Sequence, residues 1–443
     1  MKTFSNLDTA EAFKISRRRF GFLALGTLAV MGGVAGYAYY WQRGARPVVA
    51  LIDDGVGALD VVGPMEILGR LPDARGLYTA AEAGAKKVAR GPLTFHVDIR
   101  LSDLEQPDVI LLPGIAGREP SATEIAWLKR VAPAARLILG VGEGQRWLAA
   151  AGLQPDNMKI VASEGGAAAI DAALMATARL AGRDYAEALQ LAIEYDPAPP
   201  YANVNAGAPV IQLPTAPALR AAILLYDGMT SLDAIGPYEV LSRVPAISID
   251  LVGKTMTNIT SDTGALTMSV THSIENAKDY DVILIPGGAY GTQKMATDEG
   301  ILTWIKAMAV NSRLVMSVCT GALILGKTGL LNGQRATTHW ASQAALEQLG
   351  ASYLHERYVR QPKLITAAGV SAGIDVALAA LGDLFGVAVG AAIQAQLPYV
   401  PKPPFDMGAI GKASPEVVAL SKQALQRNAI ASFIRMTAYS LLG

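Results

Sequence analysis

Beyond residue 45, the apolar positions of the chain fall into two kinds of segment. Short continuous apolar runs bounded by turn residues are typical of strands buried on both faces; examples are DVILIP (281–286), RLVMSV (313–318) and KLITAA (363–368). Helical patterns such as EGILTWIKAMAV (299–310) lie between them. Strands that alternate with helices of this length predict an α/β fold with a doubly wound parallel sheet.

The first 45 residues follow a different pattern. No charged residue occurs from 20 to 42, and a helix of that length spans roughly 34 Å, enough to cross a bilayer. Lys14 and Arg17–Arg19 precede it, so the positive-inside rule places the N-terminus in the cytoplasm and the rest outside. We therefore expect residues 1–45 to form a cytoplasmic N-terminus and a transmembrane anchor or export signal. A buried core helix is the alternative.

The string SRRRF (16–20) also resembles the start of a bacterial twin-arginine signal, although Gly21 and Phe22 depart from that pattern. No clear A-x-A cleavage site follows, which favours an uncleaved anchor. The expected location is the inner membrane, single-pass with periplasmic domains, or export to the periplasm.

The remainder of the chain repeats itself. LIDDGVGALDVVGPMEIL (51–68) matches LLYDGMTSLDAIGPYEVL (224–241) with an offset of 173 residues, and DVILLPG (108–114) matches DVILIPG (281–287) with the same offset. After an intermediate match at offset 177, YDPAPPY (195–201) matches YVPKPPF (399–405) at offset 204. Collinear matches of this kind predict a tandem duplication.

The jump in offset means that the first copy lacks about 27 residues of the second, around RATTHWASQAALEQLGASYLHERYVR (335–360). We expect a degenerate first domain at 46–205, a catalytic domain at 219–412 and a helical tail at 413–443. The Pro- and Ala-rich composition of segment 206–218 predicts a linker of limited flexibility.

Composition and charge narrow the class of protein. Apolar residues make up 51% of the 443 residues, enough for more than one core. Lys plus Arg and Asp plus Glu number 38 each, so there is no basic excess to bind nucleic acid. The four histidines are scattered without the spacing of a metal site, and neither a metal nor another cofactor is expected.

The chain contains a single cysteine, Cys319, where an apolar strand pattern stops and a small-residue helix pattern begins. A thiol just before a helix is stabilised as thiolate by the helix dipole, which predicts a lowered pKa and a nucleophile. The small residues 320–322 that follow are typical of a nucleophile elbow. Cysteine is also among the most buried residue types, so filling of a core gap is the alternative.

A nucleophile needs a proton partner and a place for developing charge. Asp233 follows the first strand of the second copy and is expected at the same sheet edge as Cys319. It is the candidate acid/base. Alternatively, it is an aspartate at a helix start that stabilises its own backbone. The N–H groups of Gly287 and Gly288 are candidates for an oxyanion hole, although Pro-Gly-Gly is often only a turn.

These segments match a known pattern. SVCTGALILGKTGLLNGQRATTHW (317–340), LHERYVR (354–360), YVPKPPF (399–405) and LDAIGPYEVL (232–241) closely resemble the isonitrile hydratases of the ThiJ/PfpI superfamily. The resemblance covers residues 219 to about 412. It implies a flavodoxin-like, class I glutamine amidotransferase-like fold and the cofactor-free hydration of an isonitrile to an N-substituted formamide.

The resemblance also implies roles for individual residues. Cys319 would attack the isonitrile carbon, Asp233 would handle the proton and activate water, and Thr320 would line the pocket. His339 falls where relatives place a histidine near the thiol, but a core or surface histidine is equally consistent with the sequence. Peptidases and deglycases of the superfamily often carry histidine after the cysteine or glutamate at the aspartate position, unlike this chain.

The first copy differs at the same positions. Gly142 stands where the second copy has Cys319, and Glu143 stands where it has Thr320, while Asp60 keeps the aspartate position. We therefore expect this copy to be catalytically silent and to serve as the partner surface of an intramolecular pseudo-dimer with a large apolar interface.

Two other classes of function are compatible with the superfamily. Ligand-sensing domains of this kind occur in transcription regulators, joined to a helix-turn-helix, but the tail SPEVVALSKQALQRNAIASFIRMTAYSLLG (414–443) is too short for that module. A periplasmic ligand sensor and another thiol-dependent hydrolase or oxidation-sensitive protein remain the alternatives.

Overall fold

The computed structural model describes residues 45–156, 158–201, 213, 215, 218–397 and 399–442. The predicted membrane segment at 20–42 and most of the predicted linker lie outside these residues. Within the described ranges no helix combines the length and the apolar character needed to span a bilayer.

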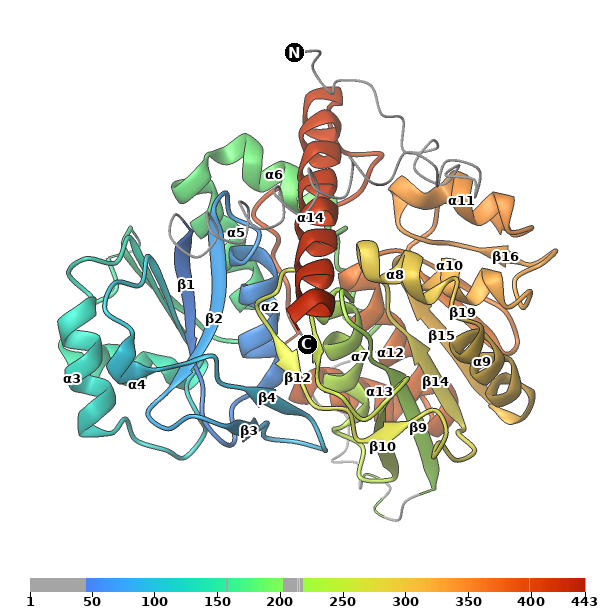
Figure 1. Ribbon diagram of the computed structural model, residues 1–443, viewed down its shortest axis with the longest axis horizontal. Coiled ribbons are helices and arrows are strands. Elements are labelled where there is room, and N and C mark those ends of the chain that lie inside the picture. Colours follow the sequence, from blue (N-terminus) through green and yellow to red (C-terminus); the bar gives the residue numbers. More distant parts are fainter. Residues whose placement is uncertain are drawn as a thin grey trace.

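Two parallel sheets form the centre of the molecule, with helices on both sides of each (Figure 1). The strands of the first sheet, in spatial order, are β5 (Ile99–Arg100), β2 (Ala74–Ala80), β1 (Arg46–Leu51), β6 (Val109–Leu112), β7 (Leu137–Val141) and β8 (Ile160–Ser163). Those of the second are β13 (His272–Ser273), β10 (Ile247–Gly253), β9 (Leu219–Leu224), β14 (Val282–Ile285), β15 (Leu314–Val318), β19 (Leu364–Ala367) and the antiparallel β18 (Tyr358–Arg360). The first six strands follow the same order in both, and the predicted α/β flavodoxin-like fold is confirmed.

Helices connect the strands of each half. In the N-terminal half they are α2 (Ala58–Leu68), α3 (Ala122–Val131), α4 (Gln145–Ala151), α5 (Ala167–Ala181) and α6 (Arg183–Ala192). In the C-terminal half they are α7 (Ser231–Leu241), α8 (Tyr290–Met295), α9 (Glu299–Asn311), α10 (Gly321–Lys327), α11 (Gln343–Gln348), α12 (Val370–Phe385) and α13 (Val387–Gln396). Short 3-10 turns lie at Leu101–Asp103, Gly142–Gly144 and Trp340–Ser342.

The segment missing from the first repeat accounts for the difference between the sheets. Residues 335–360 supply α11, the edge strand β18 and a separate two-stranded sheet, β16 (Arg335–Ala336) with β17 (Ser352–Tyr353). In the N-terminal half the chain passes from α4 to β8 without such a segment.

The two halves share one hydrophobic core, which contains buried residues from both sheets. Helices α2 and α7 pack against each other at its centre. A small sheet also crosses the boundary, because β4 (Thr94–His96) pairs with β12 (Thr267–Met268) between their neighbours β3 (Ala85–Lys87) and β11 (Ile259–Thr260). The halves therefore form a continuous apolar interface.

A segment of each half, which we call its arm, packs on the other half. The arm of the N-terminal half follows α6, and that of the C-terminal half follows α13. After α6, the backbone N–H of Ala198 donates to Asp375 on α12 (2.9 Å). After α13, the N–H of Lys402 donates to Asp171 on α5 (2.7 Å). Ala198 and Lys402 are 204 residues apart, as are Asp171 and Asp375, so the two contacts join equivalent positions of the repeats.

The C-terminal helix α14 (Pro415–Leu442) runs between the two halves (Figure 1). It packs on α6 of the N-terminal half and on α8 of the C-terminal half. Phe433 meets the ring of Tyr290 edge to face at 5.0 Å between centroids, and Asn428 donates to Asp262 (3.0 Å). The tail is therefore part of the interface.

Candidate active site

Cys319 lies between β15 and α10, at the carboxyl end of the sheet. Its φ angle is 56°, in the left-handed region that residues other than glycine adopt at an energetic cost. The Cys319 N–H donates to the Ala367 carbonyl (2.9 Å), and the Thr338 hydroxyl donates to the Cys319 carbonyl (3.0 Å). This tightly held turn has the geometry of a nucleophile elbow.

Asp233 lies in the first turn of α7 and is completely buried. Its side chain is in hydrogen-bonding contact with the Cys319 thiol. The Gly287 N–H donates to Oδ2 (3.1 Å), whereas Oδ1 has no nitrogen or oxygen partner among the described residues. The structure thus brings together the predicted nucleophile and the predicted acid/base.

The two groups hold their protons more tightly than free side chains do. Burial raises the pKa of Asp233 well above its ordinary value, and the negative charges of Glu66 and Asp262 raise it further. Burial also raises the pKa of the Cys319 thiol, with further contributions from the charges of Asp233 and Glu194. Both shifts favour the protonated forms of the thiol and the carboxyl.

The expected lowering of the thiol pKa was wrong. The Thr320 N–H does donate to the sulfur and lowers the Cys319 pKa, as the position before a helix predicts. Burial outweighs this single hydrogen bond, because the thiol packs against the shared core beside two acidic side chains.

Gly287 and Gly288 do not leave their N–H groups open for an oxyanion in this structure. The Gly287 N–H is bound to Asp233, and the Gly288 N–H donates to Thr320 Oγ1 (3.0 Å). The Thr320 hydroxyl in turn donates to the Gly288 carbonyl (2.9 Å). The glycine turn therefore orients Asp233 and Thr320, which differs from the predicted oxyanion role.

His339 lies at the interface of the two halves. Its Nε2 is 3.0 Å from the Ala192 carbonyl, and Nδ1 accepts from the Ala341 N–H (3.3 Å). Burial lowers the pKa of His339 to about 4, so the ring is neutral and its Nε2–H donates to Ala192. Both ring nitrogens are occupied, so His339 fixes the end of α6.

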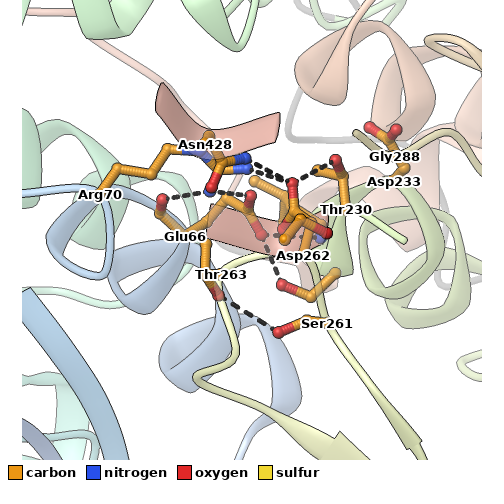
Figure 2. A network of polar contacts seen from close by, with 12 residues as sticks. Glu66, Arg70, Thr230, Asp233, Ser261, Asp262, Thr263, Gly288 and Asn428 are labelled. Atoms are coloured by element: carbon orange, nitrogen blue, oxygen red, sulfur yellow. Dashed lines mark hydrogen bonds and ion pairs between the residues drawn. The ribbon is translucent and has the colours of Figure 1, made fainter. Parts of the chain in front are cut away.

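An acidic and basic network adjoins Asp233 where α2 meets α7 (Figure 2). Arg70 pairs with Glu66 and, at 2.8 Å, with Asp262. Glu66 accepts from the Ser231 hydroxyl (2.5 Å) and the Leu232 N–H (3.2 Å) at the start of α7. The N-terminal half thus places a buried carboxylate next to the helix that carries Asp233.

The repeats form the reciprocal contact as well. Glu239, which stands 173 residues after Glu66, pairs with Arg243 and accepts from the N–H groups of Ala58 and Leu59 at the start of α2 (3.0 and 3.3 Å). Each half therefore stabilises the first turn of the other half's helix with a buried glutamate.

The corresponding turn in the N-terminal half has a similar backbone conformation but no cysteine. Gly142 has φ 52°, and a Cβ added there would lie 3.9 Å from Asp60 Oδ2. Asp60 instead accepts from the Gly166 N–H (2.6 Å), and burial raises its pKa to about 6. Glu143 pairs with Arg146 at 2.7 Å.

Several acidic residues that act on this site are not among those that the sequence predicted. Glu66 and Asp262 face Asp233, and Glu194 faces both Asp233 and Cys319. Glu66 lies inside a repeated motif and Glu194 directly precedes another, so the repeats themselves contained the signal. Their effect depends on interface packing, which spacing along the chain does not reveal.

Comparison with known proteins places this fold and elbow within a family. Residues 219–382 match the model of the DJ-1/PfpI family. The chain is 44% identical to an isonitrile hydratase of Pseudomonas putida over 201 residues, which are 45% of this chain and 87% of that protein. The chain belongs to the DJ-1/PfpI family, also called ThiJ/PfpI, and its predicted resemblance to isonitrile hydratase is confirmed.

Two further matches accompany these. An uncharacterized Streptomyces lividans protein is 35% identical over 131 residues, 29% of this chain and 92% of its own. The crystal structure of a ThiJ/PfpI family protein from Pseudomonas syringae covers 53% of this chain and 98% of its own at 32% identity, with a TM-score of 0.47.

Proposed function

We propose that this protein hydrates an isonitrile, R–NC, to an N-substituted formamide, with Cys319 as the nucleophile and Asp233 as the acid/base. The observation that carries the proposal is a thiol on a strained turn in contact with a buried carboxyl whose pKa is raised well above its ordinary value. The similarity to an isonitrile hydratase supports the choice of reaction.

A neutral acid next to a thiol suits this substrate, because an isonitrile carbon can both accept a proton and bond to a nucleophile. In the first step Asp233 protonates that carbon while the Cys319 sulfur bonds to it, and the thiol proton passes to Asp233. The new C–H and C–S bonds give a thioimidate, and the carboxyl regains its proton.

Water completes the reaction. Its oxygen bonds to the thioimidate carbon, and Asp233 passes one water proton to the nitrogen. The C–S bond then breaks as the carbonyl forms, and the remaining proton returns to sulfur. The products are the formamide and the original thiol, with no net change in oxidation state and no external reductant.

The test is direct. The full-length chain is incubated with simple alkyl and aryl isonitriles, and formamide formation is compared with that of Cys319→Ala. We expect turnover by the wild type and a loss of at least about 10³-fold in the variant. Equal turnover by Cys319→Ala would remove the covalent mechanism, and binding of isonitriles without turnover would favour a ligand-sensing role.

We also propose that the halves derive from one duplicated domain and form an intramolecular pseudo-dimer. The equal strand order, the reciprocal glutamates and the exchanged arms support this origin. Such a fusion retains the partner surface while it frees one site to change.

The location in the cell rests on the sequence alone. We propose that residues 20–42 anchor the protein in the inner membrane with the enzyme in the periplasm, or direct its export. Protease added to intact spheroplasts should digest the catalytic half; full protection until lysis would contradict this topology.

A further inference from the structure

Glu194 begins the arm that crosses from the N-terminal half to the catalytic half. The preceding carbonyl, of Ile193, accepts from the Val370 N–H (3.2 Å). The Glu194 carbonyl accepts from the Ser371 hydroxyl (3.0 Å). Both donors lie in the first turn of α12, so the backbone of Glu194 is fixed to the catalytic half.

The side chain of Glu194 is held in an enclosed place. Its φ angle is 49°, and Oε2 is buried without a hydrogen-bond partner among the described residues. A Cβ added to Gly369 would lie 2.2 Å from the Glu194 Cβ and 3.0 Å from Oε2, so only glycine leaves room there. Gly369 follows β19, whose Ala367 pairs with Val318 directly before Cys319.

The segment that the first repeat lacks positions this glutamate. His339 binds the Ala192 carbonyl, and the Trp340 indole donates to the Leu191 carbonyl (3.1 Å). The Trp340 backbone N–H donates to the Glu194 carboxyl itself. Hydrogen bonds from the catalytic half thus hold the end of α6 and the first residues of the arm.

Several charged groups face Glu194. Arg357 lowers its pKa, whereas Asp233 and Asp196 raise it. Burial is the largest influence and brings the pKa of Glu194 to about 8. When it is ionised, its charge raises the pKa of Cys319 and of Tyr353. At neutral pH Glu194 is mainly protonated and adds little negative charge to the site.

We propose that Glu194 is a positioning residue of the Cys319 site, supplied by the half that lacks a nucleophile, and that its neutral carboxyl permits the thiol to give up its proton. This inference rests on the proposed role of Cys319 as a nucleophile. The N-terminal half then contributes an ionisable group to the reaction in addition to its packing surface.

The repeats differ at this position in the way the proposal requires. At offset 204, Pro398 is the counterpart of Glu194. Glu194, in the arm of the N-terminal half, acts on the pKa of Cys319, whereas the sequence of the C-terminal half has no acid at the equivalent position. The acid and the nucleophile therefore occur in the same composite site.

The single cysteine makes a clean test possible, because alkylation of the native chain by iodoacetamide reports only on Cys319. The alkylation rate is measured against pH for the wild type, Glu194→Gln and the control Glu82→Gln, which alters an exposed loop residue of the same half. We expect Glu194→Gln to move the midpoint down by about one pH unit, because Glu194 is ionised at the alkaline pH at which the thiol titrates and the variant removes that charge. Glu82→Gln should leave the midpoint unchanged.

An unchanged midpoint in folded Glu194→Gln would overturn the proposal. If circular dichroism shows that this variant does not fold, Glu194→Asp takes its place. It keeps the acid but withdraws it by one methylene, and the midpoint should move down by a smaller amount; no movement would again overturn the proposal. Thiol titration needs no isonitrile, so failure of the hydratase assay and failure of this inference are separate results.

Discussion

The two halves of this protein have nearly the same elbow and different chemistry. Gly142 and Cys319 have φ angles of 52° and 56° at equivalent turns after β7 and β15. Asp60 and Asp233 occupy equivalent places in the first turns of α2 and α7. The same backbone geometry therefore occurs where the thiol is absent, so this turn does not require a cysteine.

The surroundings of the two aspartates also differ. The pKa of Asp60 rises to about 6, because burial and the charge of Glu239 are partly offset by Gly166 and Arg243. The pKa of Asp233 rises much further, because it is more deeply buried and two carboxylates, Glu66 and Asp262, face it. Burial, with the neighbouring charges second, therefore raises the pKa of Asp233 further than that of Asp60, which is mainly ionised at pH 7.

The largest expected effect is the difference in activity between variants of Asp233 and Asp60. Asp233→Asn should reduce formamide formation by about 10²–10⁴-fold, because it removes the acid/base, whereas Asp60→Asn should remain near the wild-type rate. Steady-state kinetics of the matched pair measure the contrast. Equal losses in both variants would show that the comparison between the halves is wrong.

The reciprocal glutamates provide a test of the interface. Glu239→Ala should lower the free energy of unfolding by about 3 kcal/mol, because it removes the carboxylate that pairs with the buried Arg243. Glu66→Ala should lower it by less, because Arg70 keeps its ion pair with Asp262. Denaturant titration measures this loss. Only Glu66→Ala should also shift the pH profile of turnover to lower pH, because Glu66 raises the pKa of Asp233. A shift of equal size in Glu239→Ala would contradict the assignment.

Placing a thiol in the N-terminal half should not give it activity. In a Cys319→Ser background, Gly142→Cys places a side chain at positive φ and should cost about 1–2 kcal/mol of stability. No formamide is expected, because Ile115 stands where the C-terminal half has Gly288, and Glu143 stands where it has Thr320. Gly142→Ala measures the strain alone, and turnover by the cysteine variant would show that the nucleophile was the only missing part.

The smallest expected effect is the pH dependence of stability caused by Glu194, in the arm of the N-terminal half. Because the pKa of Glu194 is raised from 4.5 to about 8 in the folded chain, the folded state retains a proton that the unfolded state loses. Wild-type stability should therefore fall relative to Glu194→Gln as pH rises from 5 to 8, by at least about 1 kcal/mol. Thermal unfolding at the two pH values measures the difference, and parallel curves would contradict the raised pKa.

The sequence was sufficient for the main features of the fold. Continuous apolar runs such as DVILIP (281–286) predicted buried parallel strands, and β14 lies within that run. The small residues after Cys319 predicted the turn, and the position of Asp233 after the first strand predicted its place at the same sheet edge. Local pattern determines these features, so spacing along one chain reveals them.

Features that depend on packing between the halves were not predictable in the same way. The thiol pKa was expected to fall because only the adjacent helix was considered, and burial beside Asp233 and Glu194 reverses it. His339 was expected either near the thiol or as a core or surface histidine, and in the structure it binds α6 of the other half. Both outcomes depend on a neighbour more than 80 residues away in the sequence.

The most direct measurement is the mass of the enzyme during turnover. The full-length wild-type chain is mixed with an aryl isonitrile, quenched in acid during turnover and digested for mass spectrometry. The account predicts that the peptide containing Cys319 gains the mass of one isonitrile. Formamide production by Cys319→Ser at the wild-type rate, with no adduct on any peptide of the enzyme, would contradict it.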